Sequence, residues 1–299
     1  MKYDESTLQS WTKPLSDTEE QRAKDTINMI RSAIDACDEL RQMDIEVFLQ
    51  GSYANNTNVK TDSDVDVCVM VKDSFHIELP DGMEMNDYGF SESDFSFDYY
   101  RKLIKQALKT KFQADYVKDG NKSLKIDENT YHVKADVVPA LMLKNYYYNH
   151  SKDPCSYIEG TWIIPKTGKC IANYPKKHIQ NGRTKNNQTN GFYKKLVRIM
   201  KHIKNNMVDD KIVDNDIISS FLIECLVWNI PNDIIMQYDS WEETIRESIV
   251  FLYDSIDNGK HNYWGEVSEI LYLFQGRKWK EQDVKQMLLD AWKYLDFDK

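Results

Sequence analysis

The sequence predicts an α+β protein of two lobes, the first built on a sheet and the second built only of helices. Two observations support the sheet. Val65, Val67 and Val69 alternate with Asp64, Asp66 and Cys68, and a similar alternation follows along 131–138, which is the period-2 pattern of strands with one buried face. A third observation supports the helices: from Gly191 onward, apolar residues recur at three- to four-residue spacing.

The size of the chain fits this division. With 299 residues, 41% of them hydrophobic and 12% aromatic, it can bury one large core or two modest ones. We expect two domains, residues 1–165 and residues 166–299. The change of pattern that separates them falls near residues 150–190.

Composition and termini also exclude several protein classes. No apolar run is long enough to cross a bilayer, and the N-terminus lacks the basic and apolar regions of a signal peptide, so we expect a cytoplasmic protein with no membrane partner. The five cysteines form no CxxC or Cys/His cluster. This argues against a zinc ribbon or a disulfide framework and indicates reduced packing residues.

The first predicted element is a long helix from Asp17 to about Arg41. Ser16 and Asp17 can cap its start, acidic residues follow at once, and isoleucines at 27, 30 and 34 share one face. A strand over Glu46–Gln50 comes next.

That strand leads into the pair Gly51-Ser52 and an Asn/Thr-rich connector, after which valines alternate with Asp64 and Asp66. Alternation on a strand projects both carboxylates to the same side. Hard divalent cations take oxygen ligands and use one or two carboxylates together with substrate phosphates. The stretch from Gly51 to Asp66 therefore predicts a site for a metal ion and a nucleoside triphosphate.

The rest of the first lobe supplies a third carboxylate. An acidic connector over 88–96 precedes a helix over Phe97–Phe112, and strand signals follow around 114–117, 123–126 and 131–138.

In the last of these predicted strands, His132, Lys134 and Asp136 alternate with Tyr131, Val133 and Ala135, and we expect Pro139 to end the strand. A neighbouring strand could then bring Asp136 beside the first two aspartates. Two metal ions could in that case stabilise both the attacking and the leaving oxygen of a phosphoryl transfer.

Each of these pieces alone also fits an ordinary turn or a solvated strand face. The inference depends on their order, which is a strand, Gly-Ser, a second strand with Asp-x-Asp, and a later strand with an isolated aspartate.

The second half begins with a predicted hairpin over 157–164 that turns at 165–169. Helical periodicity then marks the remaining elements, which we expect over residues 192–206, 216–228, 241–256 and 281–297. The tryptophans of this half are predicted to be core residues rather than surfaces on which bases stack.

Charge is distributed unevenly. The chain has a net charge of −9, yet between Glu159 and Asp209 there is no acidic residue and there are eleven lysines and arginines. We interpret this stretch as a positive wall that faces triphosphates, although a solvated basic helix and loop would look the same. The acidic remainder would repel a long polyanion, so strong double-stranded DNA binding is not expected.

Taken together, these motifs resemble the polymerase-beta-type nucleotidyltransferase superfamily, and more closely the bacterial CD-NTase family, which is related to cyclic GMP-AMP synthase and oligoadenylate synthase. Besides the three aspartates, the resemblance rests on segments of the second half: Asn173–His178, Lys185–Thr189, Phe192–Lys201 and Ile218–Glu224. It implies a polymerase-beta-like core with a mixed sheet and an oligoadenylate-synthase-like helical lobe.

The resemblance also implies roles for individual residues. Asp64, Asp66 and Asp136 would hold two Mg²⁺ or Mn²⁺ ions, with Asp136 also orienting or activating the attacking ribose hydroxyl. Gly51 and Ser52 would contact the phosphates of the donor nucleotide. Lys201 and Ser220 match positions that contact the triphosphate, and Phe221 matches an aromatic that stacks on a base, although Ser219 makes the register ambiguous by one residue.

The function implied is synthesis of a cyclic di- or trinucleotide from ribonucleoside triphosphates (ATP, GTP or pyrimidine nucleotides) in anti-phage defence, with the product acting on a separate effector protein. One alternative is a nucleotidyltransferase that modifies RNA or protein, as toxin-antitoxin enzymes do, or makes linear oligonucleotides. A nucleotide-binding scaffold without activity is the other. Base choice, linkage and ring size depend on the shape of the pocket and cannot be read from these motifs.

Overall fold

The computed structural model describes residues 1–59, 64–129, 132–147 and 153–298. The chain packs as two compact units that do not follow a single cut in the sequence. One, the sheet unit, comprises Ser16–Ala54 and Thr61–Lys176. The other, the helical unit, comprises Met1–Leu15, Asn55–Lys60 and Lys177–Lys299. The division into domains 1–165 and 166–299 stays a prediction. The two compact units have different bounds from these domains.

The sheet unit is built on a mixed sheet. Within the described residues its seven strands are β1 Ile45–Leu49, β2 Val65–Glu78, β3 Val117–Asp119, β4 Leu124–Ile126, β5 Ala135–Asn145, β6 Ile158–Ile163 and β7 Ile171–Asn173. The order along the main path is β1-β2-β5-β4-β3, and β6 pairs with β5 and β7. β2 and β5 run parallel, whereas the other pairs are antiparallel.

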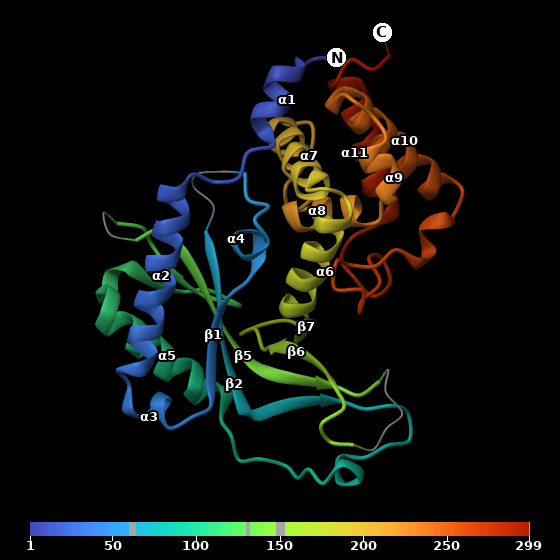
Figure 1. The fold of residues 1–299 in the computed structure, drawn as a ribbon. Coiled ribbons are helices and arrows are strands. Elements are labelled where there is room, and N and C mark those ends of the chain that lie inside the picture. Colours follow the sequence, from blue (N-terminus) through green and yellow to red (C-terminus); the bar gives the residue numbers. More distant parts are fainter. Residues whose placement is uncertain (60–63, 130–131, 148–152, 299) are drawn as a thin grey trace. The chain divides into compact units, whose positions relative to one another are not determined.

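One face of this sheet is covered by two helices, α2 Asp17–Asp35 and α5 Phe97–Phe112 (Figure 1). Their apolar sides form a core with alternate residues of the central strands: Ile27, Ile30, Ile34, Ile104 and Leu108 pack with Val65, Val67, Val69, Val71 and Val137. Because side chains alternate along a strand, Asp66 and Asp136 are on the opposite face. That face continues as a smaller apolar cluster that includes Cys68, Met70, Val138 and Met142.

The strand that carries Asp136 differs from our expectation. It begins at Ala135, so His132 and Lys134 precede it, and Tyr131 lies outside the described residues. It also runs through Pro139 to Asn145 instead of ending there. β4 pairs with β5 only as far as Val137 and β6 pairs only from Leu141, so Pro139 has a neighbouring strand on one side alone. A proline that lacks an N–H is tolerated at such an edge position.

Other boundaries in the sheet unit also moved. The helix predicted to reach Arg41 ends at Asp35, because Cys37 is extended at φ −94° and ψ 116°, and a separate short helix, α3 Asp38–Arg41, follows. The predicted cap at the start of α2 is confirmed, since Ser16 and Glu19 form a capping box. The Gly-Ser turn opens a short helix, α4 Gly51–Asn55.

The strand signal at 114–117 was largely wrong, since 114–116 form a 3₁₀ turn (η2 Ala114–Tyr116). Another short 3₁₀ turn, η1 Met85–Tyr88, precedes the predicted connector.

The helical unit holds the remaining elements: α1 Glu5–Trp11, most of α6 Pro175–Gln188, α7 Phe192–Asp209, α8 Ser220–Trp228, α9 Asn232–Met236, α10 Trp241–Asp257, η3 Lys260–Tyr263 and α11 Glu281–Tyr294. Its core is one large cluster in which α7, α8, α10 and α11 contribute buried aliphatic residues. Figure 1 labels these four helices. Helix α1, which comes from the start of the chain, belongs to this core through Leu8, which is fully buried.

The structure also bears on the predictions made from apolar runs and from the cysteines. The described helices include none that is long and apolar enough to cross a membrane. All five cysteines are free thiols, as expected, but only Cys68 and Cys225 are buried. Cys155 and Cys170 are exposed, so the prediction that all five are packing residues was wrong for these two.

Candidate active site

Asp66 and Asp136 lie side by side at the start of two parallel strands. In the β2–β5 ladder Asp66 is directly opposite Asp136, and Val65 is opposite Ala135. Residues directly opposite each other in a ladder have side chains on the same face, about 5 Å apart. Asp64 is exposed and lies one residue before β2, two positions from Asp66. The sheet therefore brings together the aspartates that come from stretches about seventy residues apart in the sequence.

The row of side chains extends beyond the two aspartates. On one side, the backbone N–H of Gln50 donates to the carbonyl of Asp66 at 2.9 Å, so β1 continues to the edge of the site. On the other side, Lys125 of β4 is directly opposite Asp136. The sheet therefore places a cation beside the third aspartate.

Gly51 is in contact with this row and must be a glycine. Its φ is +66°, in the left-handed region that side chains disfavour. A Cβ built at this position would overlap Asp66 Oδ2 and lie 3.0 Å from Asp66 Cγ. The backbone at the Gly51-Ser52 turn thus passes directly against the Asp66 carboxylate, which is the close approach that a glycine allows.

The carboxyl groups share a poorly solvated, negatively charged environment. Burial, together with the neighbouring charges of Asp136 and Asp64, raises the pKa of Asp66 to about 7. Burial also raises the pKa of Asp136; Lys125 and the Ser123 hydroxyl oppose this rise, and Asp64 adds to it. Clustered carboxylates that resist ionisation are typical of functional sites, where a cation is the natural compensation.

The donor set fits a divalent metal ion. Asp136 Oδ1 is buried and has no hydrogen-bond partner among the described residues, so one of its lone-pair positions is available to a cation. In the part of the chain that the structure describes, no three His, Cys, Asp or Glu side chains form a ready-made metal cluster. A site of two or three carboxylates completed by phosphate oxygens and water is the arrangement that Mg²⁺ favours, because this ion keeps few protein ligands.

Sequence reasoning missed Lys125 and Ser123. Both fall in the stretch 123–126 that the pattern predicted to be a strand, and that prediction was close, since β4 is Leu124–Ile126. Only the pairing register, however, shows that Lys125 faces Asp136. No signal in the sequence itself could have revealed that contact.

The other predicted site residues belong to the helical unit, where each has its own surroundings. Lys201 of α7 is 2% exposed, and its ammonium is 2.6 Å from Glu224 Oε2. Phe221 of α8 is partly buried and stacks on Trp279, with ring centroids 5.6 Å apart. Ser219 is the N-cap of α8, accepting from the backbone N–H of Leu222 at 3.3 Å.

Ser220 is the first residue of α8 and is partly buried. Among the described residues its hydroxyl has no hydrogen-bond partner, so it is available to a ligand. The two serines between which the sequence was ambiguous therefore differ in the structure, because Ser219 caps the helix and Ser220 does not.

Several cations of the basic stretch between Glu159 and Asp209 have partners within the protein and are not simply solvated. Lys176 contacts Glu46 at 2.7 Å and Glu159 at 2.6 Å, and Lys185 donates to the carbonyl of Ile230 at 2.8 Å. Several of the eleven cations therefore have structural partners. That the remainder faces triphosphates stays a prediction.

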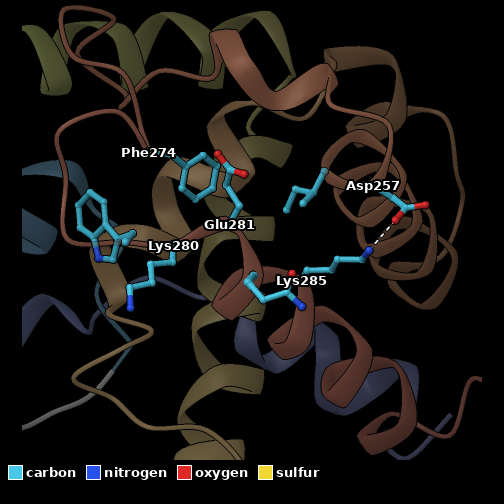
Figure 2. Close-up of a pocket in the computed structure, with 8 residues that line it drawn as sticks. Asp257, Phe274, Lys280, Glu281 and Lys285 are labelled. Atoms are coloured by element: carbon cyan, nitrogen blue, oxygen red, sulfur yellow. Dashed lines mark hydrogen bonds and ion pairs between the residues drawn. The ribbon is translucent and has the colours of Figure 1, made fainter.

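A hollow lies in the helical unit, between the end of α10 and the start of α11 (Figure 2). Its volume is about 450 Å³, and lysines and aromatic rings line it together with acidic groups. Lys285 is paired with Asp257, and Glu281 lies 3.1 Å from His261. Because its cations are already offset by carboxylates, this hollow does not offer the net charge that a triphosphate requires.

Two family models match the chain. A nucleotidyltransferase domain covers residues 30–145, and the C-terminal helical domain of cGAS/DncV-like nucleotidyltransferases covers residues 180–296. The first range includes β1, β2 and β5 with all three aspartates. The second includes most of the helical unit.

Curated and solved proteins match over nearly the full length. The cyclic dipyrimidine nucleotide synthase CdnE of Cecembia lonarensis is 41% identical over 298 residues, 99% of each chain. The CdnE c-UMP-AMP synthase of Rhodothermus marinus, solved with Apcpp and Upnpp, superposes with a TM-score of 0.86 at 28% identity, covering 99% of this chain and 98% of that one.

The CdnE cyclic dinucleotide synthase of Elizabethkingia meningoseptica, solved with GTP and Apcpp, gives a TM-score of 0.82 at 30% identity and covers 98% of this chain and 99% of that one. The expected α+β fold, a nucleotidyltransferase core with a C-terminal helical domain, is confirmed by these matches.

Proposed function

Because the chain belongs to the cGAS/DncV-like nucleotidyltransferases, the CD-NTase family, we propose that it joins two ribonucleoside triphosphates into a cyclic dinucleotide. It is a nucleotidyltransferase, and its full-length relatives are cyclic nucleotide synthases. The observation that carries the proposal for this chain is the pairing of Asp66 with Asp136 against the Gly51 backbone.

The side chains would act on the nucleotides as follows. Asp66 and Asp136, with Asp64, would hold two divalent metal ions, Mg²⁺ or Mn²⁺, which when bound offset the negative charge of the reacting phosphates. Asp136 would orient the attacking ribose hydroxyl and accept its proton. The hydroxyl oxygen forms a bond to the α-phosphorus as the bond to pyrophosphate breaks, and a second round closes the ring.

The donor phosphates would be held by the turn. The backbone amides of Gly51 and Ser52 and the Ser52 hydroxyl are the proposed contacts, supported by the close approach of this turn to Asp66. We also keep Ser220 as a contact to the triphosphate and Phe221 as a surface for a base. Lys201 stays a proposed contact too, although its ammonium would have to exchange one of its present partners.

Pyrimidine nucleotides are the first substrates to test. The two relatives from Cecembia lonarensis and Legionella pneumophila, 41% and 36% identical to this chain, are both named cyclic dipyrimidine nucleotide synthases. More distant relatives of 31–32% identity are named for purine or mixed products. We therefore propose UTP and CTP as preferred substrates and a cyclic dipyrimidine nucleotide as the product.

The biological setting is also a proposal. The family context suggests that the cyclic product is a signal in anti-phage defence of the CBASS type and acts on a separate effector protein. Nothing in the described surface favours a second function over this one.

The decisive experiment is incubation of the purified protein with the four labelled ribonucleoside triphosphates and Mg²⁺ or Mn²⁺, followed by phosphatase treatment and mass analysis. A phosphatase-resistant dinucleotide is expected, and the variant with both Asp64→Asn and Asp66→Asn should stay folded and make none. Product formation by that folded variant would contradict the site. Label that remains on added RNA or on the protein would instead favour the alternative, a transferase with a macromolecular acceptor.

A further inference from the structure

The helical unit is assembled from three separate stretches of chain, and one buried residue in each stretch is held by hydrogen bonds. The stretches are residues 1–15, 55–60 and 177–299. Thr12 lies near the end of the first, Thr57 lies within the second, and His178 is the second residue of the third. All three residues are buried, with at most 7% of their surface exposed.

Arg198 of α7 joins the first two stretches. Its Nε donates to the carbonyl of Thr12 at 2.8 Å, and its Nη1 donates to the carbonyl of Asn56 at 2.6 Å. Arg198 is itself buried, at 5% exposure. This buried arginine donates to two backbone carbonyls and has no carboxylate partner among the described residues. It therefore acts as a cross-link between the two segments.

Lys201 lies one turn further along α7 and uses all three of its protons. They go to Glu224 Oε2 at 2.6 Å, to the Thr57 hydroxyl at 3.0 Å and to the Thr57 carbonyl at 3.2 Å. The Thr57 hydroxyl in turn donates to Glu224 Oε2 at 2.8 Å. Thr57 is thus held both through its backbone and through its side chain.

Glu224 of α8 brings the third stretch into the same network. Its second oxygen, Oε1, is 2.9 Å from His178 Nε2. Although burial alone would raise its pKa, the charge of Lys201 and the hydrogen bond of His178 hold the pKa of Glu224 well below its ordinary value. The carboxylate is therefore ionised and is the central acceptor for partners from α7, from Thr57 and from the start of the third stretch.

A core that needed only stability would not require these groups. Burying an ion pair usually gains little over apolar packing, whereas removing one partner is costly, so such groups are better suited to specifying one arrangement. We propose that Arg198, Lys201 and Glu224 are positioning residues that fix the first two stretches and the start of the third on helices α7 and α8. For the reaction the second stretch matters most, because Thr57 lies between Ser52 and Asp64 in the sequence.

This inference rests on the proposed function only for its effect on turnover. Its structural part can be tested by hydrogen exchange of the backbone amides in residues 10–14 and 55–58. Thr57→Val keeps the shape of the side chain and removes the hydroxyl, and Glu224→Gln removes the charge. Both should raise exchange in 55–58 by about tenfold or more, the factor expected when one hydrogen bond to a charged group is lost.

Glu266→Gln is the matched control. Glu266 is also a buried acid of the helical unit, 1% exposed and paired with Arg277, and neither residue forms a hydrogen bond with the described residues of 1–15 or 55–60. The control should lower stability without changing exchange in 55–58. Thr57→Ser keeps the hydroxyl and should behave as the unaltered protein does.

The second readout separates positioning from direct contact with nucleotide. Thr57→Val and Glu224→Gln should lower kcat by about tenfold to a hundredfold, as displacement of reacting groups by a fraction of an ångström does, while KM for the nucleotide changes by less than about threefold. Thr57→Ser should restore kcat. A rise in KM with unchanged kcat would overturn the proposal, because these groups would then act on nucleotide binding alone and not on the position of the reacting groups.

Two other results would also overturn it. One is unchanged exchange in 55–58 for both variants, and the other is an equal loss of kcat in Glu266→Gln at matched stability. If the unaltered protein makes no nucleotide product, the proposed function fails, and the exchange experiment still decides whether these residues hold the connecting stretches.

Discussion

Replacing Gly51 by alanine tests the geometry of the site with the smallest possible change. A methyl group added at this position would overlap Asp66 Oδ2, with the Asp66 Cγ only 3.0 Å away. Since the overlap is with a proposed metal ligand, either the turn or the carboxylate must move. The substitution should therefore disturb the reaction far more than it disturbs the fold.

The expected cost has two parts. Holding alanine at φ +66° costs roughly 1–2 kcal/mol, because its Cβ crowds the following carbonyl oxygen. Overlap in a packed site adds about 1–3 kcal/mol. We expect a loss of about 2–5 kcal/mol in the free energy of unfolding if the turn keeps its shape, and a fall in kcat of about a hundredfold because Asp66 is displaced.

Gly82→Ala is the control for backbone strain. Gly82 is in the same unit, at φ +79°, but a Cβ there would meet nothing within 4 Å. It should lose about 1–2 kcal/mol and keep full activity. The assays are thermal or urea unfolding and dinucleotide formation from labelled triphosphates. Unimpaired turnover by Gly51→Ala, or an equal loss of turnover in both variants, would refute the reasoning.

Three further predictions concern stability. The raised pKa of Asp66, about 7 against 3.8, means that the folded state retains a proton the unfolded chain has lost, so metal-free stability should fall between about pH 4 and 7 by up to about 4 kcal/mol. Melting at pH 5 and 8 should show this fall, Asp66→Asn should reduce it, and a melting temperature that does not change with pH would contradict it. Asp119→Asn should cost about 1–3 kcal/mol in urea unfolding at pH 7, because Asp119 pairs with Arg101 at 3.0 Å and Lys105 at 2.9 Å; a neutral effect would show that these pairs are only surface contacts. Leu8→Ala should cost about 2–5 kcal/mol by opening a cavity in the helical core, and a negligible cost would place α1 outside that core.

Much of the fold was predictable because it depends on patterns within short stretches. The alternation around Asp66 predicted β2, and the three- to four-residue spacing predicted α5, α7 and α10 to within a few residues. The errors arose where context overrode the local pattern. Pro139 was expected to end a strand, but β5 continues through it. Neither β4 nor β6 pairs with β5 at that point, so the N–H that proline lacks is not needed there.

The candidate site divides in the same way. The sequence predicted Gly51, Asp64, Asp66 and Asp136 as site residues, and the structure brings Gly51, Asp66 and Asp136 together. Lys125 could not be found, because its relation to Asp136 depends on strand pairing.

Local periodicity and residue chemistry, which are properties of the chain itself, thus determined most of the elements, the fold class and the choice of candidate carboxylates. Only the tertiary structure decided which partners meet: Asp66 with Asp136 across β2 and β5, Leu8 with the helical core, and Lys201 with Glu224 and Thr57. The physical reason is that strand register, ion pairing and core packing join residues far apart in the sequence. Their free energy depends on three-dimensional proximity and burial, which no local pattern encodes.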